Sequence, residues 1–396
     1  MYLPKSLNKY TNCTLINECR HNKTCRKNCG EKNTGFFIGT VIKYSKRHHQ
    51  LFGIYDGELM RKPNQTVMKI VSGTFQDFLE REQFHALIPL FLISHSSQGY
   101  GFIDEIGALY GLMWNTPKFV ISLALRILAR NPKSPKNTYN PKENGDFILV
   151  DGFEKIWNTI VKRERLDIVY NVDIKIIDRN ERNVKMKYED ASAKLFVQTC
   201  DFLIWTPPMP ELLKRVSAIS ATEFDLFSTL IHHVFAASLM RAKNTARNTP
   251  ISYYSQTISD KIEHAVTADI DVKGSSDIAC NNLNVSSYDK NEKDARLITV
   301  LQLGRTATNE AHLNKVARNH YEKEFHATDV EIFNTITWPY FYKWDQHEVA
   351  KGNHWKVFDL QGHQRTWYAG ASVSFESVKS VMEYNNLLLR QLGINS

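Results

Sequence analysis

The stretch RTWYAGASVSFESVKSVMEYNNLLLRQLG, residues 365–393, combines a strand, a tight turn and a helix. An apolar triplet runs into Gly370, and apolar side chains then recur at helical spacing. We predict that the helix begins immediately after Gly370, with Ser374 as its N-cap and Gly393 as its C-cap. A glycine at such a turn lets a ligand approach the backbone, and the unpaired N–H groups of a helix N-terminus attract an anion such as a phosphate. The same pattern is typical of the last strand and helix of an ordinary α/β core.

Residues 145–215 repeat this alternation of helix and strand. Apolar residues recur at helical spacing from Phe153 to Val161, and a period of two follows from Ile168 to Ile176. Two further short strands over 184–197 complete a meander. Residues 202–205 then form an apolar run that predicts a strand buried on both faces, ended by prolines that cannot donate to a ladder. Helix, meander and buried strand in this order are typical of a nucleotide-binding α/β sheet.

The remaining segments predict a mixture of strands and helices. Strands are expected over 35–54, 67–71 and 297–303, and helices from Thr74, after Thr116-Pro117, over 209–247 and over 311–325. Glycines alternate with aromatic residues in GYGFIDEIGALYGLMW (99–114). This alternation predicts either close approaches of the backbone or a loop that lines a cavity.

Candidate catalytic and metal-binding residues are few. The adjacent His232 and His233 face different sides of the predicted helix, so we do not expect them to share a metal ion. Lys243 is compatible with a lysine in a site and with a solvated lysine at a helix end. We assign neither a catalytic base nor a metal ligand.

Composition limits the class of protein. With 396 residues, of which 42% are hydrophobic, the chain can bury two medium-sized cores. Its apolar runs are far shorter than the roughly 20 residues that a membrane-spanning helix needs, so we expect a soluble chain with no transmembrane segment. The formal charge of +8 comes from lysines and arginines spread along the chain without interleaved aromatic residues, so we expect no nucleic-acid partner.

Cysteines and glycosylation sequons leave the compartment open. Four of the six cysteines lie in the polar stretch 1–34, which predicts a tail without a hydrophobic period: Cys13, Cys19, Cys25 and Cys29. N-x-S/T sequons begin at four asparagines: Asn12, Asn22, Asn64 and Asn284. Disulfides in the secretory pathway and chance sequons beside a disordered tail both explain this pattern. The first ten residues lack the apolar core of a signal peptide.

Four segments resemble motifs of the flavin-containing amine oxidase superfamily, in the order of that family. DGFEKIW (151–157) resembles its GG-F/M-x-x-L/I helix start, and LDIVYNVDIKIIDR (166–179) its L-N-x-x-V-x-x-I strand. CDFLIWTPP (200–208) resembles its A-D-x-V-I-x-T-x-P strand. TWPYFYKW (337–344), followed by WYAGASVSFESVKSVMEYN (367–385), resembles its aromatic segment and its Y-F-A-G-E flavin-binding end. The superfamily includes monoamine and polyamine oxidases, with desaturase or isomerase relatives.

The resemblance implies FAD as the cofactor and a small-molecule substrate, either an amine or an apolar compound. Cofactor contacts are implied for Ile174 beside the adenine, Thr206 and Pro207 at the end of their strand, Gly370 and Ala371 at the pyrophosphate and ribityl chain, and Ser377 and Val378 at the isoalloxazine. Three aromatic residues are implied to face the substrate: Trp338, Tyr340 and Tyr342.

The sequence also departs from this family. It contains no G-x-G-x-x-G motif, which opens the chain in the family and binds the pyrophosphate. We therefore expect the first nucleotide-binding unit to be missing and favour a truncated gene product. Ala371 replaces a common Glu, and Ser377 stands where amine oxidases often place an aromatic ring, so we expect no aromatic cage for an amine at that position.

We predict an α/β fold in which an incomplete Rossmann-like FAD/NAD(P)-binding domain is interleaved with a mixed α+β substrate domain. The expected parts are a tail (1–34), a first substrate part with a remnant of the nucleotide-binding region (35–144), an FAD-binding segment (145–215), a second substrate part (216–345) and a C-terminal FAD-binding segment (346–396). The expected function is FAD-dependent oxidoreduction, with hydride transfer from the substrate to flavin N5. Two alternatives stay open: flavin-dependent isomerisation or desaturation of an apolar substrate, and a catalytically inactive homologue that acts as a binding protein. The oligomeric state is left open.

Overall fold

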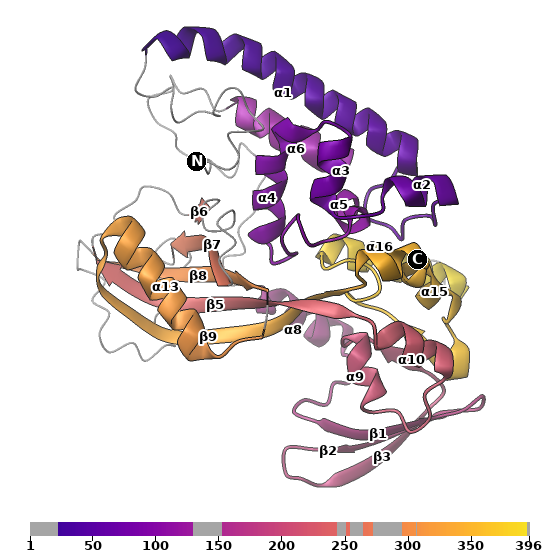
Figure 1. Ribbon diagram of the computed structural model, residues 1–396. Helices are drawn as coiled ribbons and strands as arrows, with labels where there is room; N and C mark the ends of the chain where they lie inside the picture. The colour runs from indigo at the N-terminus through magenta and orange to yellow at the C-terminus, as the bar shows by residue number, and fades with distance from the viewer. Residues whose placement is uncertain are drawn as a thin grey trace.

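The computed structural model describes residues 23–129, 153–243, 251–253, 264–271, 295–305 and 307–393 (Figure 1). The prediction for residues 1–22 and the sequon at Asn284 lie outside these ranges. The described elements form a helical group, a large antiparallel sheet and a smaller α/β part. Among the described residues, no helix has both the length and the apolar content that crossing a bilayer requires.

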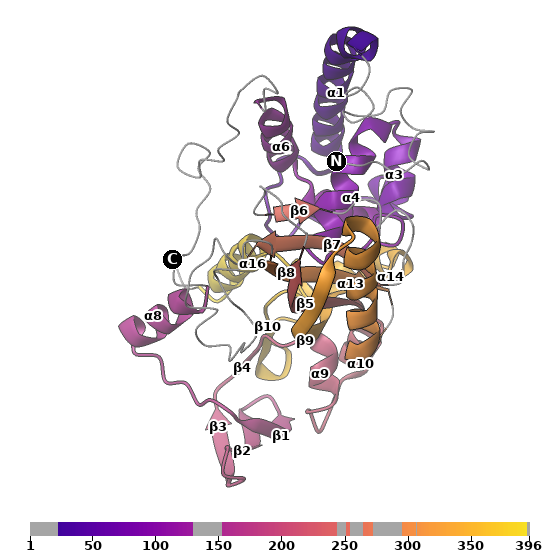
Figure 2. The same cartoon turned by 90° about the vertical axis from the view of Figure 1, so that its left-hand side faces the viewer.

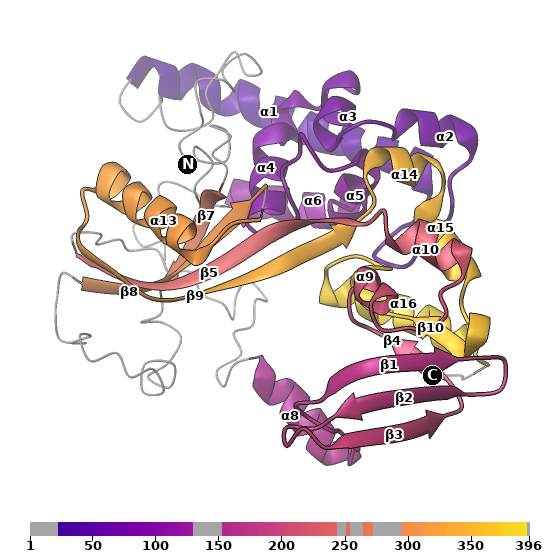
Figure 3. The same cartoon turned by 60° about the horizontal axis from the view of Figure 1, so that its bottom comes forward.

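The large sheet has five strands in the order β6-β7-β8-β5-β9, all paired antiparallel. Its strands are β5 (Ile231–Lys243), β6 (Ile251–Tyr253), β7 (His264–Asp271), β8 (Ala295–Gly304) and β9 (Thr328–Lys343). The helix α13 (Glu310–Phe325) lies across one face (Figures 1 and 3), where Ala317 and Tyr321 join Met240 and Val300 in a small core. Because β9 is an edge strand, its C-terminal end is available to build a site.

The helical group contains the first third of the chain. Its elements are α1 (Lys23–Phe52), α2 (Gln65–Ile70), α3 (Phe75–Arg81), η3 (His85–Leu87), α4 (Ile88–Ser96), α5 (Ala108–Trp114) and α6 (Pro117–Ala129). Two predicted helix starts are confirmed: Thr74 forms a capping box with Asp77, and Thr116 Oγ1 accepts from the Phe119 N–H at 3.3 Å. The predicted close approach at the glycines is also confirmed, because a Cβ on Gly111 would lie 2.1 Å from the Phe75 ring.

The smaller α/β part holds most of the segments that carry the resemblance, whereas the aromatic segment 337–344 lies at the end of β9 in the large sheet. β1 (Asp173–Arg179), β2 (Val184–Glu189) and β3 (Leu195–Cys200) form the predicted meander, and β4 (Leu203–Trp205) pairs in parallel with β10 (Thr366–Tyr368). Its helices are α8 (Glu154–Glu164), α9 (Met209–Leu213), α10 (Ala221–Phe227), α14 (Gln346–Ala350), α15 (Asn353–Asp359), η5 (His363–Arg365) and α16 (Val378–Gln391). A buried ion pair between Arg179 and Glu223 joins β1 to α10, with a nitrogen–oxygen distance of 2.8 Å.

Two strands predicted near the N-terminus are wrong. The predicted strand over 35–54 belongs to one helix, Lys23–Phe52, which also includes the end of the predicted tail. The buried residues of this helix have the helical spacing of three and four: Val41, Tyr44, His48 and Leu51. The predicted strand over 67–71 is the helix α2, because the Asn64 side chain caps it by accepting from the Val67 N–H at 2.9 Å.

The helix predicted over 209–247 is wrong beyond Phe227. Burial alternates along β5, as a strand on a packed sheet requires: Val234, Ala236, Ser238, Met240 and Ala242 are buried. The apolar residues of this stretch fit the period of a helix and the period of two of a strand. The hydrogen-bonded ladders with β8 and β9 decide for the strand. The prediction that residues 202–205 are buried on both faces is also wrong, since Ile204 is 51% exposed.

Candidate functional site

The loop between β10 and α16 brings the C-terminal motif against the end of β4. Gly370 has a φ of 91°, a conformation that favours glycine, and a Cβ there would lie 2.7 Å from the Thr206 carbonyl oxygen. The helix begins later than predicted, because Ser377 and not Ser374 is the N-cap: the Ser377 hydroxyl accepts from the Ser380 N–H at 3.1 Å. Ser374 Oγ donates instead to the Gly370 carbonyl at 3.0 Å, which keeps the loop compact.

Replacing this glycine tests the close approach to β4. We expect Gly370→Ala to lower the free energy of unfolding by about 1–3 kcal/mol, because it adds strain in both conformation and space. Gly393→Ala is the matched control: its φ is also positive, at 74°, but nothing lies within 4 Å of its Cβ position. We expect the control to lose the conformational part alone, about 1–2 kcal/mol. Urea unfolding followed by circular dichroism measures both, and equal losses would show that the contact with Thr206 has no effect.

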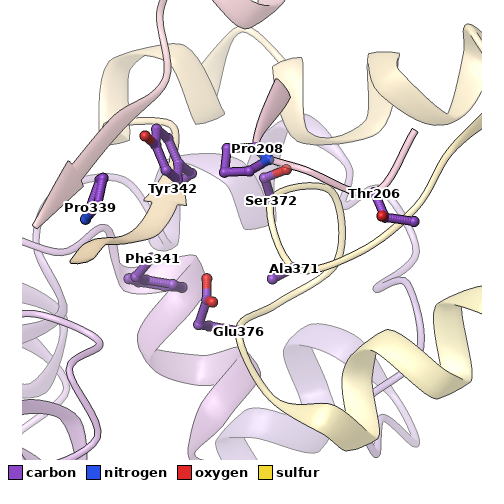
Figure 4. Close-up of a pocket in the computed structure, with 8 residues that line it drawn as sticks. All are labelled: Thr206, Pro208, Pro339, Phe341, Tyr342, Ala371, Ser372 and Glu376. Carbon is purple, nitrogen blue, oxygen red and sulfur yellow. The ribbon is translucent and has the colours of Figure 1, made fainter. Parts of the chain in front are cut away.

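A cavity of about 230 Å³ lies beside this loop (Figure 4). It is formed where the end of β4, the end of β9 and the loop after Gly370 meet. Its lining residues are Thr206, Pro208, Pro339, Phe341, Tyr342, Ala371, Ser372 and Glu376. Pockets that enclose a whole small-molecule ligand measure roughly 300–1,000 Å³. The cavity therefore suits a ring system or one part of a larger ligand.

Two polar groups are placed on the cavity wall. Figure 4 shows the Glu376 carboxylate directed toward Phe341 and Ala371. Burial raises the pKa of Glu376 to about 7, although the positive charge of Lys343 and a hydrogen bond from the Phe341 N–H both oppose this rise. The hydroxyl of Ser372 is buried and has no hydrogen-bond partner within the described part of the chain. At neutral pH the wall therefore offers a carboxyl group that can hold or release a proton and a hydroxyl that can bond to a ligand.

A buried lysine lies close to the same wall. The Lys343 ammonium is 4.8 Å from the centre of the Phe341 ring and has no hydrogen-bond partner among the described residues. Burial lowers the pKa of Lys343 to about 7. It also lowers the pKa of His95, to about 3, and that of His233, and the charge of Lys343 lowers both further. The two imidazoles therefore stay neutral near pH 7, and the charged groups nearest this wall are Lys343 and Glu376.

The structure brings three of the predicted site residues to the cavity: Thr206, Ala371 and Tyr342 line it. The other predicted residues do not: Ile174, Pro207, Gly370, Ser377, Val378, Trp338 and Tyr340. Pro207 and Gly370 are chain neighbours of lining residues, and Ser377 is occupied as the cap of α16. Val378 and Trp338 are 52% and 40% exposed, and Tyr340 stacks on Tyr100 with ring centres 6.5 Å apart.

Two residues singled out in the sequence lie away from the cavity lining. The Ile174 carbonyl, which the resemblance places beside an adenine, accepts a hydrogen bond from the Arg215 guanidinium. Lys243 pairs with Asp329 at a nitrogen–oxygen distance of 2.7 Å. It lies at the opposite end of β5 from the pairing with Lys343, so it does not reach the cavity.

Sequence reasoning missed Ser372, Glu376 and Lys343 as candidate functional residues. Glu376 matched the first turn of a helix, where an acidic residue is ordinary. Lys343 gave a stronger signal, because it is the one charged residue inside the aromatic segment TWPYFYKW. Among the described residues, no group of three or more His, Cys, Asp or Glu side chains is arranged to hold a metal ion.

Known structures share this fold, although their sequences differ greatly from this one. Neither the models of known protein families nor the curated proteins match the sequence. The structure is similar to that of a CLA-producing fatty acid isomerase from P. acnes, with a TM-score of 0.69 and 19% identity over 92% of this chain and 76% of that chain. It is also similar to wild-type putrescine oxidase bound to putrescine, with a TM-score of 0.56 and 8% identity over 91% of this chain and 76% of that chain. The predicted resemblance to the amine oxidase superfamily is thus confirmed at the level of the fold.

Proposed function

We propose that the cavity beside Gly370 holds the ring system of a flavin, and that the chain is a flavin-dependent enzyme that isomerises a double bond in an apolar substrate. The observation that carries the proposal is the cavity itself, which forms at the glycine turn between β10 and α16 and contains the unpartnered Ser372 hydroxyl. The fatty acid isomerase has the higher TM-score of the two similar structures, which supports an apolar substrate over an amine.

The residues present fit the ring end of FAD better than its adenosine end. Ala371, Ser372 and Thr206 would hold the ring, since the compact loop supplies a buried hydroxyl and exposed backbone at the cavity wall. Near the expected adenine position, the Ile174 carbonyl is already bonded to Arg215. The cavity would therefore bind the flavin ring, while the described residues form no binding site for the adenosine.

The residues around the cavity have separable roles in such a reaction. A bound flavin would supply a two-electron carrier that takes a hydride from one substrate carbon and returns a hydride to another, so that the isomerisation leaves no net oxidation. Pro208, Pro339 and Phe341 exclude water and so strengthen electrostatic interactions in the cavity. Glu376, with its pKa raised to about 7, is placed to hold or release a proton at the carboxyl oxygen. Lys343 would stabilise negative charge that develops beyond Phe341.

A second candidate function is that of a binding protein without a cofactor. It is favoured by the occupied Ile174 carbonyl and by the absence of a G-x-G-x-x-G turn anywhere in the sequence. The two candidates differ in one directly measurable property, which is the flavin content of the purified protein.

Flavin content and product analysis test the first proposal. We expect purified protein incubated with FAD and then desalted to retain flavin absorbance, and Ser372→Ala to retain several-fold less because it removes the hydroxyl without adding bulk. Ser374→Ala is the matched control, since its hydroxyl bonds within the loop. With linoleate and without oxygen, we expect a conjugated diene, and Glu376→Gln should reduce its rate by about 100-fold.

Each result decides between named alternatives. If the wild type and its variants all retain no flavin absorbance after desalting, the second candidate function, that of a binding protein, is supported. Oxygen consumption with putrescine, and none with linoleate, replaces the isomerase by an amine oxidase.

A further inference from the structure

The strand β4 leaves one edge of its small parallel sheet open. It pairs with β10 alone among the described strands, and its Trp205 carbonyl accepts from the Ala369 N–H at 3.0 Å. Successive residues of a strand direct their backbone groups to opposite neighbours, so Ile204 directs its N–H and C=O to the side away from β10. Parallel sheets are ordinarily covered on both faces. β4 thus has the composition of an interior strand in an edge position.

Exposed apolar side chains accompany this open edge. Ile204 is 51% exposed and Phe202 is 52% exposed. The helix α8 stands beyond β4 on the side away from β10 (Figures 2 and 3) and buries none of its residues. Its apolar stripe is exposed along its length: Phe153, Trp157 and Ile160. An exposed apolar stripe of this kind is typical of an interaction site on a folded protein.

The segment after α8 shows the same lack of a partner. The sequence predicts a strand from Ile168, yet β1 begins only at Asp173. The apolar residues before it are exposed and belong to no strand: Leu166, Ile168, Val169 and Tyr170. Residues that favour strands are expected to stay outside a sheet when no neighbouring strand pairs with them.

We propose that the open edge of β4 binds an extended apolar strand of a separate polypeptide, which adds in parallel and covers the apolar stripe of α8. Main-chain bonds to Ile204 would give affinity, and alternate side chains would give specificity, as in other cases of strand addition. A second copy of this chain is the poorer occupant, because β4 has only 3 residues and both copies carry a net charge of +8. Among the exposed charged residues of α8, three basic side chains outnumber the acidic Glu154 and Glu164, which favours acidic residues flanking the added strand: Lys155, Lys162 and Arg163.

A designed peptide tests this proposal on the full chain. The probe is the acetylated, amidated peptide EEVIVIVEE, and its matched control is EEVIPIVEE, whose proline cannot join a ladder. We expect saturable binding of the probe by fluorescence anisotropy, binding of the control at least about tenfold weaker, and slower exchange of the Ile204 amide with the probe alone. Ile204→Pro should weaken binding of the probe, and Ile204→Thr, which keeps the N–H, should preserve it.

Several outcomes would overturn the proposal. Equal binding of both peptides would mean unspecific adhesion to an apolar surface, and no binding would mean that the edge accepts no strand. Slow exchange of the Ile204 amide before any peptide is added would mean that the chain covers its own edge. A concentration-dependent dimer that protects the same amide would assign the edge to a second copy. None of these measurements involves a flavin, so they stand apart from the test of the proposed function.

Discussion

Replacing Arg179 by leucine is expected to remove about 3–5 kcal/mol from the free energy of unfolding, because it leaves a buried carboxylate without its counter-ion. The Arg179 and Glu223 side chains are completely buried, and two guanidinium nitrogens reach the two carboxylate oxygens at 2.8 and 3.1 Å. The same guanidinium donates to Thr366 Oγ1 at 3.0 Å. The Tyr368 hydroxyl also donates to Glu223. The pair therefore links β1, α10 and β10 through one charged cluster.

Urea unfolding of matched variants separates this effect from the loss of a surface charge. Arg163→Leu is the control, since its pair with Glu164 is exposed and is expected to contribute no more than about 0.5 kcal/mol. The double variant Arg179→Leu/Glu223→Leu should recover part of the lost stability, because no charge is then left buried. A double variant that is less stable than Arg179→Leu would contradict this expectation.

The pH dependence of stability follows from the carboxylate. Burial alone would raise the pKa of Glu223, but the hydrogen bonds from Arg179 and Tyr368 lower it to about 2. A lowered folded-state pKa contributes stability that is fully present above the ordinary pKa of about 4.5 and is lost as the pH falls toward 2. We expect Arg179→Leu to lose this dependence, which pH titration of the unfolding midpoint would detect.

Replacing Lys343 by methionine is expected to stabilise the protein by about 1–4 kcal/mol at pH 7, which is the opposite of the usual effect of a core substitution. The ammonium is buried without a hydrogen-bond partner among the described residues, and methionine fills a similar volume without a charge. Lys351→Met is the control, because Lys351 is half exposed and pairs with Glu348 at the surface. A loss of stability on Lys343→Met would show that the ammonium has a partner in solution.

The gain should also depend on pH in a defined direction. Burial lowers the pKa of Lys343 from 10.5 to about 7. The unfolded chain therefore binds more protons than the folded one between these values, and the wild type gains stability as the pH rises from 7 to 10.5. The advantage of Lys343→Met should be full below pH 7 and fade by pH 10.5. Glu376 is present in both proteins, but Lys343→Met removes a charge that opposes the rise in the pKa of Glu376, so the loss of stability caused by Glu376 above pH 4.5 extends to a higher pH in the variant.

A buried lysine that costs stability is more readily understood beside a functional cavity than in an ordinary core. Stability and activity often oppose each other where charged groups are held without partners. We therefore expect Lys343→Met to raise the unfolding midpoint while slowing any reaction in the cavity.

Local signals predicted helix ends and meander strands well. The capping residue Thr74, the Thr116-Pro117 start and the period of two through β2 each depend on neighbours within a few residues. The strand β5 and the helix α1 could not be assigned in this way, because their apolar residues fit two periods. In both cases the period is decided by the surface against which the element packs, and the residues of that surface lie far away in the sequence.

The sequence by itself predicted a strand, a glycine turn and a helix over residues 365–393. The reason is local, because the positive φ at position 370 and the close approach to the Thr206 carbonyl are tolerated by glycine and not by a residue with a Cβ. The sequence also predicted a resemblance to the amine oxidase superfamily, which the similarity to a putrescine oxidase structure supports at the level of the fold. Only the tertiary structure decided which side chains share the cavity and that Lys343 and Glu376 have pKa values near 7. Burial causes those shifts, and burial depends on segments from β4, β9 and the C-terminal loop meeting in space, which no local pattern encodes.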